Sequence, residues 1–287
     1  MNILNKEKTA ETGNLNRSND DDIAILVPSF DGYQDLWKSF FSCFFKYWPD
    51  CPYPIFLGSN FQTYDDPLVS PIRIGEDKDY SSNLIAMLSH MEHEWVIVML
   101  DDVLLSAPVH TSKVKRIIAV AQDKGAGHVQ LLASRYNPTI AIAFPLISDE
   151  VAVIPIGLPY RASLNLGLWK KSVLLKLLQP GETAWDFERQ GSLRTFKLKD
   201  KFFCLSKKQI SDPPFRFIHG VVKREWTWEA NQFMQKEECY GFLNNRRIQS
   251  FSSYLKLKFY IFLRYFIYIV IHKLFGKEVI LRIVSKK

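Results

Sequence analysis

Two adjacent carboxylates, Asp101 and Asp102, directly follow residues 95–100, the most strand-like segment of the sequence. Ligands of open α/β sheets bind beyond the carboxyl ends of the strands. Neighbouring carboxylates there are costly to keep ionised unless a cation joins them. Such a pair, together with substrate phosphates, suits Mg²⁺ or Mn²⁺. The pattern therefore predicts a divalent metal that stabilises a diphosphate leaving group. The alternative is that both residues only cap the next turn.

Three further acids, Glu182, Asp186 and Glu188, lie in one short segment after Pro180 and Gly181. On a helix, Glu182 and Asp186 share a face, while Glu188 lies on another. A hydroxyl that displaces a nucleoside diphosphate needs a carboxylate base near its oxygen. The segment is therefore a candidate source of that base. The alternative is an acidic first turn that complements the helix dipole.

Short polar loops follow the first two expected strands. Because both loops come after strands, we expect them at the same edge of the sheet, where they could bind a base and a ribose. Ordinary turn chemistry is the alternative for each loop. The candidate nucleotide-sugar-binding residues are Pro28, Ser29, Phe30, Asp31, Ser59 and Asn60, together with Asp101.

A single histidine, His219, lies downstream of the expected sheet in the stretch Phe215-Arg-Phe-Ile-His-Gly220, before Lys223 and Arg224. It is a candidate third metal ligand beside Asp101 and Asp102, or a contact to the diphosphate. A structural role is the alternative, since an isolated histidine more often packs than binds.

The elements that must position these residues alternate along the chain. Short apolar runs bounded by turn residues predict strands, and longer periodic stretches predict helices. This alternation predicts an α/β fold with a mostly parallel central sheet covered by helices on both faces. The expected strands are 23–27, 53–57, 95–100, 128–132, 151–154 and 160–166, and the expected helices are 33–47, 84–91, 114–122, 169–178 and 182–190.

The charge of the chain is concentrated at its end. The formal net charge is +7, and residues 251–287 alone carry eight Lys or Arg against one Glu. Residues 1–250 therefore sum to zero, which argues against a core that binds nucleic acid. Four cysteines without a CxxC pair predict reduced thiols and no disulfide framework.

The two ends of the chain are expected to differ from the middle. Residues 1–22 have no apolar stretch of the signal-peptide kind and are predicted to be a disordered leader. Residues 251–287 form a basic, hydrophobic tail, in which the longest uncharged run is 265–271. A spanning helix needs about 20 apolar residues. The tail is therefore predicted to lie on an anionic membrane surface with its basic side chains at the headgroups, the alternative being a buried terminal helix.

The ordered set of motifs resembles the GT-A nucleotide-diphosphosugar glycosyltransferases of bacterial surface-polysaccharide biosynthesis. The matching pieces are Ile25-Leu-Val-Pro-Ser-Phe30, the strand that runs into Asp101-Asp102, Asn165-Leu-Gly-Leu-Trp-Lys170 and Glu182-Thr-Ala-Trp-Asp-Phe-Glu188. The resemblance covers about residues 23–226. It implies a Rossmann-like nucleotide half at about 23–105 and an acceptor half at about 106–250, which together form a catalytic domain at 23–250.

The same resemblance implies a metal site of the Asp-x-Asp type, an inverting transfer, and a glycan acceptor that is lipid-linked at the inner face of the cell membrane. Such a protein would be cytoplasmic and peripheral. Two departures are visible: the metal motif reads Leu-Asp-Asp-Val, and Glu182 is followed by Thr183 where many relatives have Asp. Glu182 is the preferred base, with Glu188 next.

Two other classes of function are compatible with the motifs. One is a catalytically inert scaffold at the membrane surface, although such a protein has no need of acids at 101, 102, 182 and 188. The other is a sugar nucleotidyltransferase, which would want a glycine-rich basic loop after the first strand to bind a triphosphate. The loop Pro28-Ser-Phe-Asp-Gly-Tyr33 has one glycine and no basic residue, which ranks this class lower.

Overall fold

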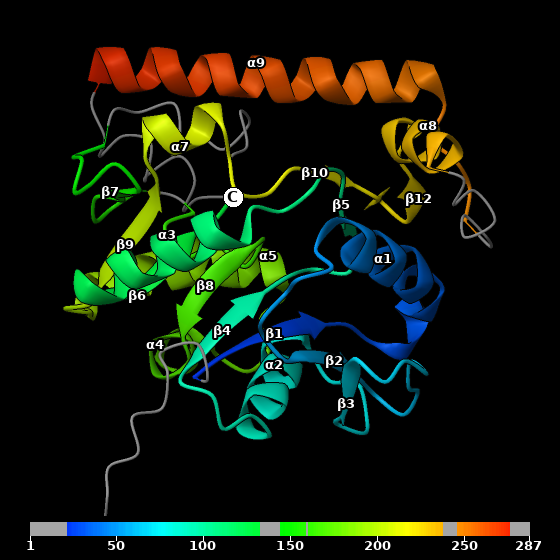
Figure 1. The fold of residues 1–287 in the computed structure, drawn as a ribbon. Coiled ribbons are helices and arrows are strands. Elements are labelled where there is room, and N and C mark those ends of the chain that lie inside the picture. Colours follow the sequence, from blue (N-terminus) through cyan, green and yellow to red (C-terminus); the bar gives the residue numbers. More distant parts are fainter. Residues whose placement is uncertain (1–21, 133–143, 159, 238–245, 276–287) are drawn as a thin grey trace, which may run out of the picture.

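The computed structural model describes residues 22–132, 144–158, 160–237 and 246–275. Its centre is an eight-stranded sheet (Figure 1) in the order β3-β2-β1-β4-β8-β6-β9-β7. Strands β8 and β7 run opposite to the other six, because β8 is antiparallel to β4 and β6, and β7 is antiparallel to β9. In sheet order the strands are Val69–Arg73, Ile55–Ser59, Ile23–Pro28, Trp95–Val98, Gly167–Lys170, Ala126–Gln130, Lys201–Leu205 and Val151–Val153.

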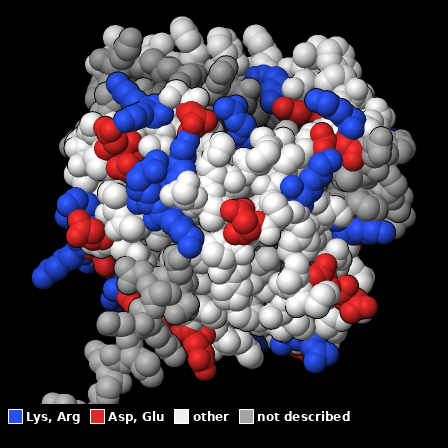
Figure 2. Space-filling view, in the orientation of Figure 1, with Lys and Arg blue, Asp and Glu red and all other residues white. Residues whose placement is uncertain are grey.

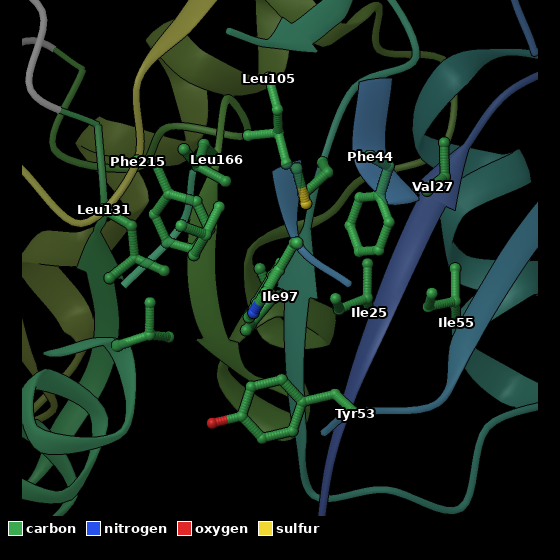
Figure 3. Packing of buried hydrophobic residues seen from close by; sticks show 14 of the residues in the cluster. Ile25, Val27, Phe44, Tyr53, Ile55, Ile97, Leu105, Leu131, Leu166 and Phe215 are labelled. Carbon is green, nitrogen blue, oxygen red and sulfur yellow. The ribbon is translucent and has the colours of Figure 1, made fainter. Parts of the chain in front are cut away.

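Helices cover both faces of this sheet. Every residue of β1 is buried, as expected for a central parallel strand covered on both sides. Helices α1 (Gln34–Tyr47) and α3 (Thr111–Asp123) pack on the face of Ile25 and Val27 (Figure 3). Helices α2 (Tyr80–Ser89) and α4 (Lys171–Leu177) pack on the opposite face. The predicted α/β class with a mostly parallel central sheet is therefore confirmed.

Two separate two-stranded sheets and several short helical segments complete the fold. Strand β5 (Val103–Leu105) pairs with β10 (Phe217–His219), and β11 (Val221–Val222) pairs with β12 (Glu225–Trp226). A composite helix contains α5 (Ala184–Asp186), one π-helical turn (Phe187–Gly191) and α6 (Ser192–Arg194). Single 3-10 turns occupy Asp31–Tyr33 and Thr195–Lys197, and α7 is Lys207–Ser211.

Two helices end the described chain. Helix α8 (Trp228–Lys236) lies against α1, where the Tyr47 hydroxyl donates to Glu237 at 2.6 Å. The long helix α9 (Phe251–Phe275) begins on α8, with the rings of Trp228 and Phe251 4.9 Å apart (Figure 1). On the face shown in Figure 2, basic and acidic side chains are interspersed below α9. Within the described ranges no helix is long and apolar enough to span a membrane.

One expected strand is wrong. Residues 160–166 form turns, with Tyr160 and Leu166 at φ 57 and 47, and the strand is β8 at Gly167–Lys170. The helix expected to begin at residue 169 begins at Lys171. The apolar residues of this stretch are buried in turns as well as in the strand, so hydrophobicity alone did not locate the boundary. The predicted leader lies outside the described residues except for Asp22, as does the tail beyond residue 275.

Candidate active site

The candidate site lies at the carboxyl ends of β1 and β4, where the order of strands reverses. From β1 the chain proceeds outward to β2 and β3, and then returns to place β4 on the other side of β1. Such switch points are the usual ligand-binding crevices of open α/β sheets. The Ser29 hydroxyl, just after β1, donates to Asp101 and accepts a hydrogen bond from the Trp37 indole at 2.8 Å. These bonds fix Asp101 beside the end of β1.

Asp101 and Asp102 are carboxylates short of positive charge. Asp101 is only 5% exposed, and burial, together with the charge of Asp102, raises its pKa to about 8. Burial raises the pKa of Asp102 to about 6. Both carboxylates offer hard oxygen ligands, and a dication would supply the charge that burial removes. The residues present therefore fit a divalent metal.

A cation that the sequence did not single out acts on this pair. The charge of Arg246 lowers the pKa of both Asp101 and Asp102, against the larger effect of burial. Its guanidinium donates to Asp35 on α1 at 2.8 Å and lies 4.5 Å from the centre of the Tyr33 ring. More than a hundred residues separate Arg246 from the aspartates, and it belongs to no recognisable motif, so only the fold reveals it.

The three carboxylates of the acidic segment at 182–188 lie in two different environments. Glu182 forms two hydrogen bonds with the Arg194 guanidinium, at 2.8 and 2.6 Å. Asp186 closes a capping box with Thr183 and pairs with Arg189, which lowers its pKa. Both side chains therefore stabilise the composite helix, and both are already bonded to cationic or capping partners.

Glu188 occupies a different environment, at the π-helical turn. Its Oε1 accepts hydrogen bonds from the Ser163 hydroxyl at 2.8 Å and from the Leu164 amide at 3.2 Å. Burial raises its pKa despite these bonds. Ser192 holds the turn in place, since its hydroxyl donates to the Glu188 carbonyl oxygen at 2.6 Å and accepts from the Ala162 amide at 3.0 Å. Of the three predicted acids, Glu188 is the one that hydroxyl and amide groups orient, with no cationic partner among the described residues.

The Tyr80 phenol is influenced by the charges of both Glu188 and the aspartate pair. Burial raises the pKa of the Tyr80 phenol, and three carboxylates raise it further, Glu188 most and then Asp101 and Asp102. The hydroxyl is buried and has no hydrogen-bond partner among the described residues. Tyr80 is the first residue of α2, and no motif in the sequence singles it out.

The predicted nucleoside-binding loops contact one another. The Asp31 carboxylate accepts hydrogen bonds from the amides of Asn60, Phe61 and Gln62 at 3.0, 3.1 and 3.2 Å. The Asn60 side chain accepts from the Asp31 amide at 3.2 Å and donates to the Gly75 carbonyl at 2.9 Å. We call this set of bonds between residues 31 and 60–62 the loop junction.

The other predicted residues of these loops are also engaged with the protein. The buried Ser59 hydroxyl donates to the Gln62 carbonyl at 2.5 Å, and Pro28 lies opposite Gly58 in the sheet. Phe30 packs on the Tyr33 ring at a centroid distance of 4.5 Å. The structure thus brings both loops together at one edge, while their contact with a nucleoside stays a prediction.

His219 is not assembled with the aspartates into a metal site. Across the part of the chain that the structure describes, no three His, Cys, Asp or Glu side chains are grouped as metal ligands. In β10, His219 is opposite Val103, and its side chain is exposed. The charges that act on its ring belong to Lys258 of α9 and Glu229 of α8. Among the described residues His219 is therefore not grouped with Asp101 and Asp102, which corrects its predicted role as third ligand.

Comparison with known proteins identifies similar solved structures only. No family model and no curated protein sequence matches the chain. The mannosyltransferase PcManGT of Pyrobaculum calidifontis, in complex with GDP-Man and Mn²⁺, has a TM-score of 0.47 at 13% identity, over 86% of this chain and 72% of its own. S. aureus TarS 1–349 in complex with UDP-GlcNAc has a TM-score of 0.42 at 10% identity, over 75% and 64%.

A third similar structure, glucosyl-3-phosphoglycerate synthase of Mycobacterium tuberculosis, has a TM-score of 0.37 at 12% identity, over 61% of this chain and 65% of its own. The chain thus spans less than two thirds of the length of two of these three structures. At such low similarity, the functional interpretation depends on this chain's own residues.

Proposed function

We propose that this protein is a metal-dependent glycosyltransferase that transfers a sugar from a nucleotide-diphosphate donor to a glycan acceptor. One observation carries the proposal: the buried Asp101 with its neighbour Asp102 at the sheet's switch point, and the half-buried, hydrogen-bonded Glu188, are close enough that all three carboxylates raise the pKa of the same Tyr80 phenol. Displacement of a diphosphate by a hydroxyl requires both a charge-neutralising site and a base, and these two groups supply them.

Asp101 and Asp102 would hold the metal, Mn²⁺ or Mg²⁺. When bound, such an ion neutralises charge on the diphosphate leaving group. Arg246 adds a fixed positive charge close enough to act on both aspartates. Ser29 fixes the position of Asp101, so the pair is pre-organised for a diphosphate at the end of β1.

Glu188 is the base in this proposal, in place of Glu182. Its carboxylate takes the proton of the acceptor hydroxyl, whose oxygen forms a bond to the anomeric carbon as the bond to the diphosphate oxygen breaks. A single displacement of this kind inverts the anomeric centre. The raised pKa suits a base that works near neutral pH, and Ser163 and Leu164 hold its Oε1. Glu182 is a poorer base because Arg194 occupies both of its oxygens.

The proposal includes peripheral attachment to the cytoplasmic face of an anionic membrane through α9, where a lipid-linked acceptor would be found. A stripe of α9 side chains is 50–66% exposed. The spacing of three and four residues puts them on one side of the helix, and Tyr260, Leu263 and Ile267 add exposed apolar surface on its other sides. Each nearby Lys or Arg would add roughly 1 kcal/mol on anionic lipid. The stripe consists of Phe251, Leu255, Phe259, Phe262 and Phe266.

The attachment is tested with anionic and neutral liposomes. The double substitution of Phe259→Ser and Phe262→Ser should release the protein from anionic vesicles without lowering its melting temperature, since both rings are exposed. Unchanged sedimentation with the vesicles would refute a role for this stripe.

The catalytic proposal is tested by a thermal-shift screen of nucleotide sugars with and without Mn²⁺. UDP-GlcNAc and GDP-Man, the ligands named for two of the similar structures, are the first donors to try. We expect a metal-dependent rise in melting temperature with one donor, and none with Asp102→Asn. A transfer assay then identifies the product anomer.

Other outcomes of the screen favour the other classes. Stabilisation by a nucleoside triphosphate together with a sugar 1-phosphate would favour a nucleotidyltransferase. Binding of a nucleotide sugar equally well by the protein and by Asp102→Asn, without turnover, would favour an inert scaffold.

A further inference from the structure

We propose that a cavity at the end of β9 binds the hydrocarbon chain of the acceptor, which is a glycan linked through a phosphate to a single lipid chain. The proposal rests on the proposed function and deepens it, since it assigns a place to the lipid part of the acceptor. Three observations carry it: the lining of the cavity, the charges at its rim, and its place in the sheet relative to Asp101 and Asp102.

The cavity lies between the hairpin that leads into β7 and the short helix α7. Its volume is about 390 Å³, near the lower end of the range of roughly 300–1,000 Å³ that is usual for ligand pockets. Such a volume favours one chain over the two chains of a membrane phospholipid. The floor is buried and consists of Ala152, Cys204 and Leu205, and the walls are Phe144, Leu146 and Ile210, which solvent reaches.

The apolar surface of the cavity continues to its mouth. Leu146 lines the cavity and is 63% exposed, and the next residue, Ile147, is 40% exposed. Exposed apolar surface beside a concave apolar site is typical of a ligand-binding groove. The floor and walls offer no charged group, so the hydroxyl groups of a sugar would lose their hydrogen bonds there. A hydrocarbon chain is the part of an acceptor that fits this lining.

The rim of the cavity carries an unpaired cation. Lys208 is paired with Asp149 at 2.5 Å, and Arg116 is paired with Glu150 at 3.2 Å. Lys207 also lines the cavity, is exposed, and has no acidic partner among the described residues. Three cations against two acids leave a net charge of +1 at the rim. A single anionic group at the head of the chain, such as a phosphate, is therefore the complementary partner.

The register of the sheet places the cavity on the same edge as the aspartate pair. One row of paired residues crosses four strands from β4 to β9 and contains, in order, Val98, Gly167, Gln130 and Cys204. Three strand spacings put Cys204 about 14 Å from Val98. Strands β4 and β9 run in the same direction, so Asp101, three residues after Val98, and the cavity at the end of β9 lie at one edge.

This separation suits an acceptor that is held by its lipid and reacts at its sugar. With the chain in the cavity and the phosphate at Lys207, a short glycan spans the distance along the strand ends to the aspartate pair. Figure 1 shows α7 and the end of β9 at the end of the molecule that carries α9. The membrane attachment proposed for α9 therefore brings a lipid chain to the mouth of the cavity.

The experiment measures binding of dodecyl phosphate, one chain with one phosphate, to the full-length protein. Isothermal titration calorimetry is used below the micelle concentration. Leu146→Ser removes an apolar wall, and Lys207→Glu reverses the charge at the rim. Leu68→Ser and Lys197→Glu are the matched controls, because Leu68 is 64% exposed, Lys197 is exposed, and neither lines the cavity. All four side chains are exposed, so the melting temperature should not change.

We expect Leu146→Ser to weaken binding by about 5- to 50-fold, since the chain loses an apolar contact. Lys207→Glu should weaken it by about 3- to 10-fold, because an exposed ion pair is replaced by repulsion. Both controls should bind like the unaltered protein. Ethyl phosphate, which has the head without the chain, should bind at least about 100-fold more weakly.

A second variant tests the cavity from its other wall. Ile210→Trp places a larger ring in the cavity from α7 and should abolish binding of dodecyl phosphate. The thermal shift produced by the nucleotide sugar and Mn²⁺ should be the same in this variant as in the unaltered protein. Loss of both ligands together would mean that the variant disturbs the whole fold, and the result with Leu146→Ser then decides.

Three results would overturn the proposal. These are no binding of dodecyl phosphate, equal binding by Leu146→Ser and the unaltered protein, and tighter binding of dioctanoyl phosphatidylglycerol, which would make the cavity a site for membrane lipid. Each leaves the proposed function intact, because the nucleotide-sugar screen decides that function separately. If the screen finds no donor while dodecyl phosphate binds, the proposed function fails, and the role of the cavity in holding an acceptor fails with it.

Discussion

The loop junction and the aspartate pair near Tyr80 both follow the ends of sheet strands, yet they differ in how many of their polar atoms are hydrogen-bonded within the protein. In the loop junction, Asp31 accepts three backbone amides and Asn60 both donates and accepts. Around Tyr80, the buried Asp101 and the half-buried Glu188 have raised pKa values, and the phenol has no hydrogen-bond partner among the described residues. Asp31, Asn60, Asp101 and Asp102 all follow strands in the sequence, and only their bonding separates the loop junction from the aspartate pair.

The difference has a physical meaning. A framework gains stability by pairing its buried polar groups, whereas a binding site must keep some of them available for its ligand. The loop junction is therefore expected to act mainly on stability, and the groups around Tyr80 mainly on catalysis. Each prediction below tests one side of this contrast.

The largest effect is expected at Glu188. Glu188→Gln should lower turnover by about 10²- to 10⁴-fold, the usual contribution of a general base, with little change in donor binding. Glu182→Gln is the matched control: it weakens the pairing with Arg194 and should lower the melting temperature while turnover of the folded protein stays within a few-fold. Steady-state kinetics and calorimetry on both variants decide the matter. The reverse pattern would return the role of base to Glu182.

A somewhat smaller effect is expected at the aspartate pair. Asp102→Asn should lower turnover by about 10²- to 10³-fold, by analogy with the loss of one charge-stabilising group. Its melting temperature without metal should not fall, because a buried charge has been removed. Full activity in this variant, measured over a titration of Mn²⁺, would contradict the metal role.

At the loop junction the expected effect is on stability. Asp31→Ala leaves three backbone amides without their acceptor and should lower the free energy of unfolding by about 1–3 kcal/mol. Turnover at saturating donor should change much less than in Asp102→Asn. Urea unfolding combined with kinetics measures both quantities. If catalysis collapses while stability holds, Asp31 belongs to the ligand and the contrast between the two regions is lost.

The smallest effect is a dependence of stability on pH. In metal-free protein the pKa of Asp101 is raised to about 8, whereas the unfolded carboxyl keeps its ordinary value of 3.8. Between these values the folded state binds more protons, so the free energy of unfolding should decrease as pH rises from 6 toward 8, by at most about 1.4 kcal/mol per pH unit.

Chemical denaturation in the presence of a chelator measures this slope. Asp101→Asn should remove it, and saturating Mn²⁺ should reverse the loss, because metal binds the ionised carboxylate. A slope that Asp101→Asn leaves unaltered would mean that other groups cause it.

Much of the framework could be predicted from the sequence. The apolar runs before Pro28 and Asp101 predicted two strands, and with them the place of the aspartates at a strand end; that the two strands are neighbours in the sheet is seen only in the structure. The turns at 160–166 could not be separated from a strand, because buried apolar residues also fill irregular segments.

The sequence could not show which of the acids at 182–188 are paired within the protein and which is a candidate base. Each role depends on the hydrogen-bond partner of the carboxylate. Tertiary packing places Arg194 beside Glu182 and Ser163 beside Glu188, and the sequence does not reveal either pairing. Arg246 and Tyr80 were missed for the same reason. Neither residue type is unusual in its local context, and only the folded chain places their charge and hydroxyl near the aspartates.

The π-helical turn at Phe187–Gly191 makes the site sensitive to chain length. A π turn accommodates one residue more than an α turn. The preceding turn is capped by Thr183, and the following one is anchored by Ser192 on Ala162. A loss of one residue between these anchors would restore regular α-helical bonding yet rotate the intervening side chains by about 100°. Removal of one residue from this turn should therefore separate the Glu188 carboxylate from Ser163 and Leu164 while the two anchors stay in place.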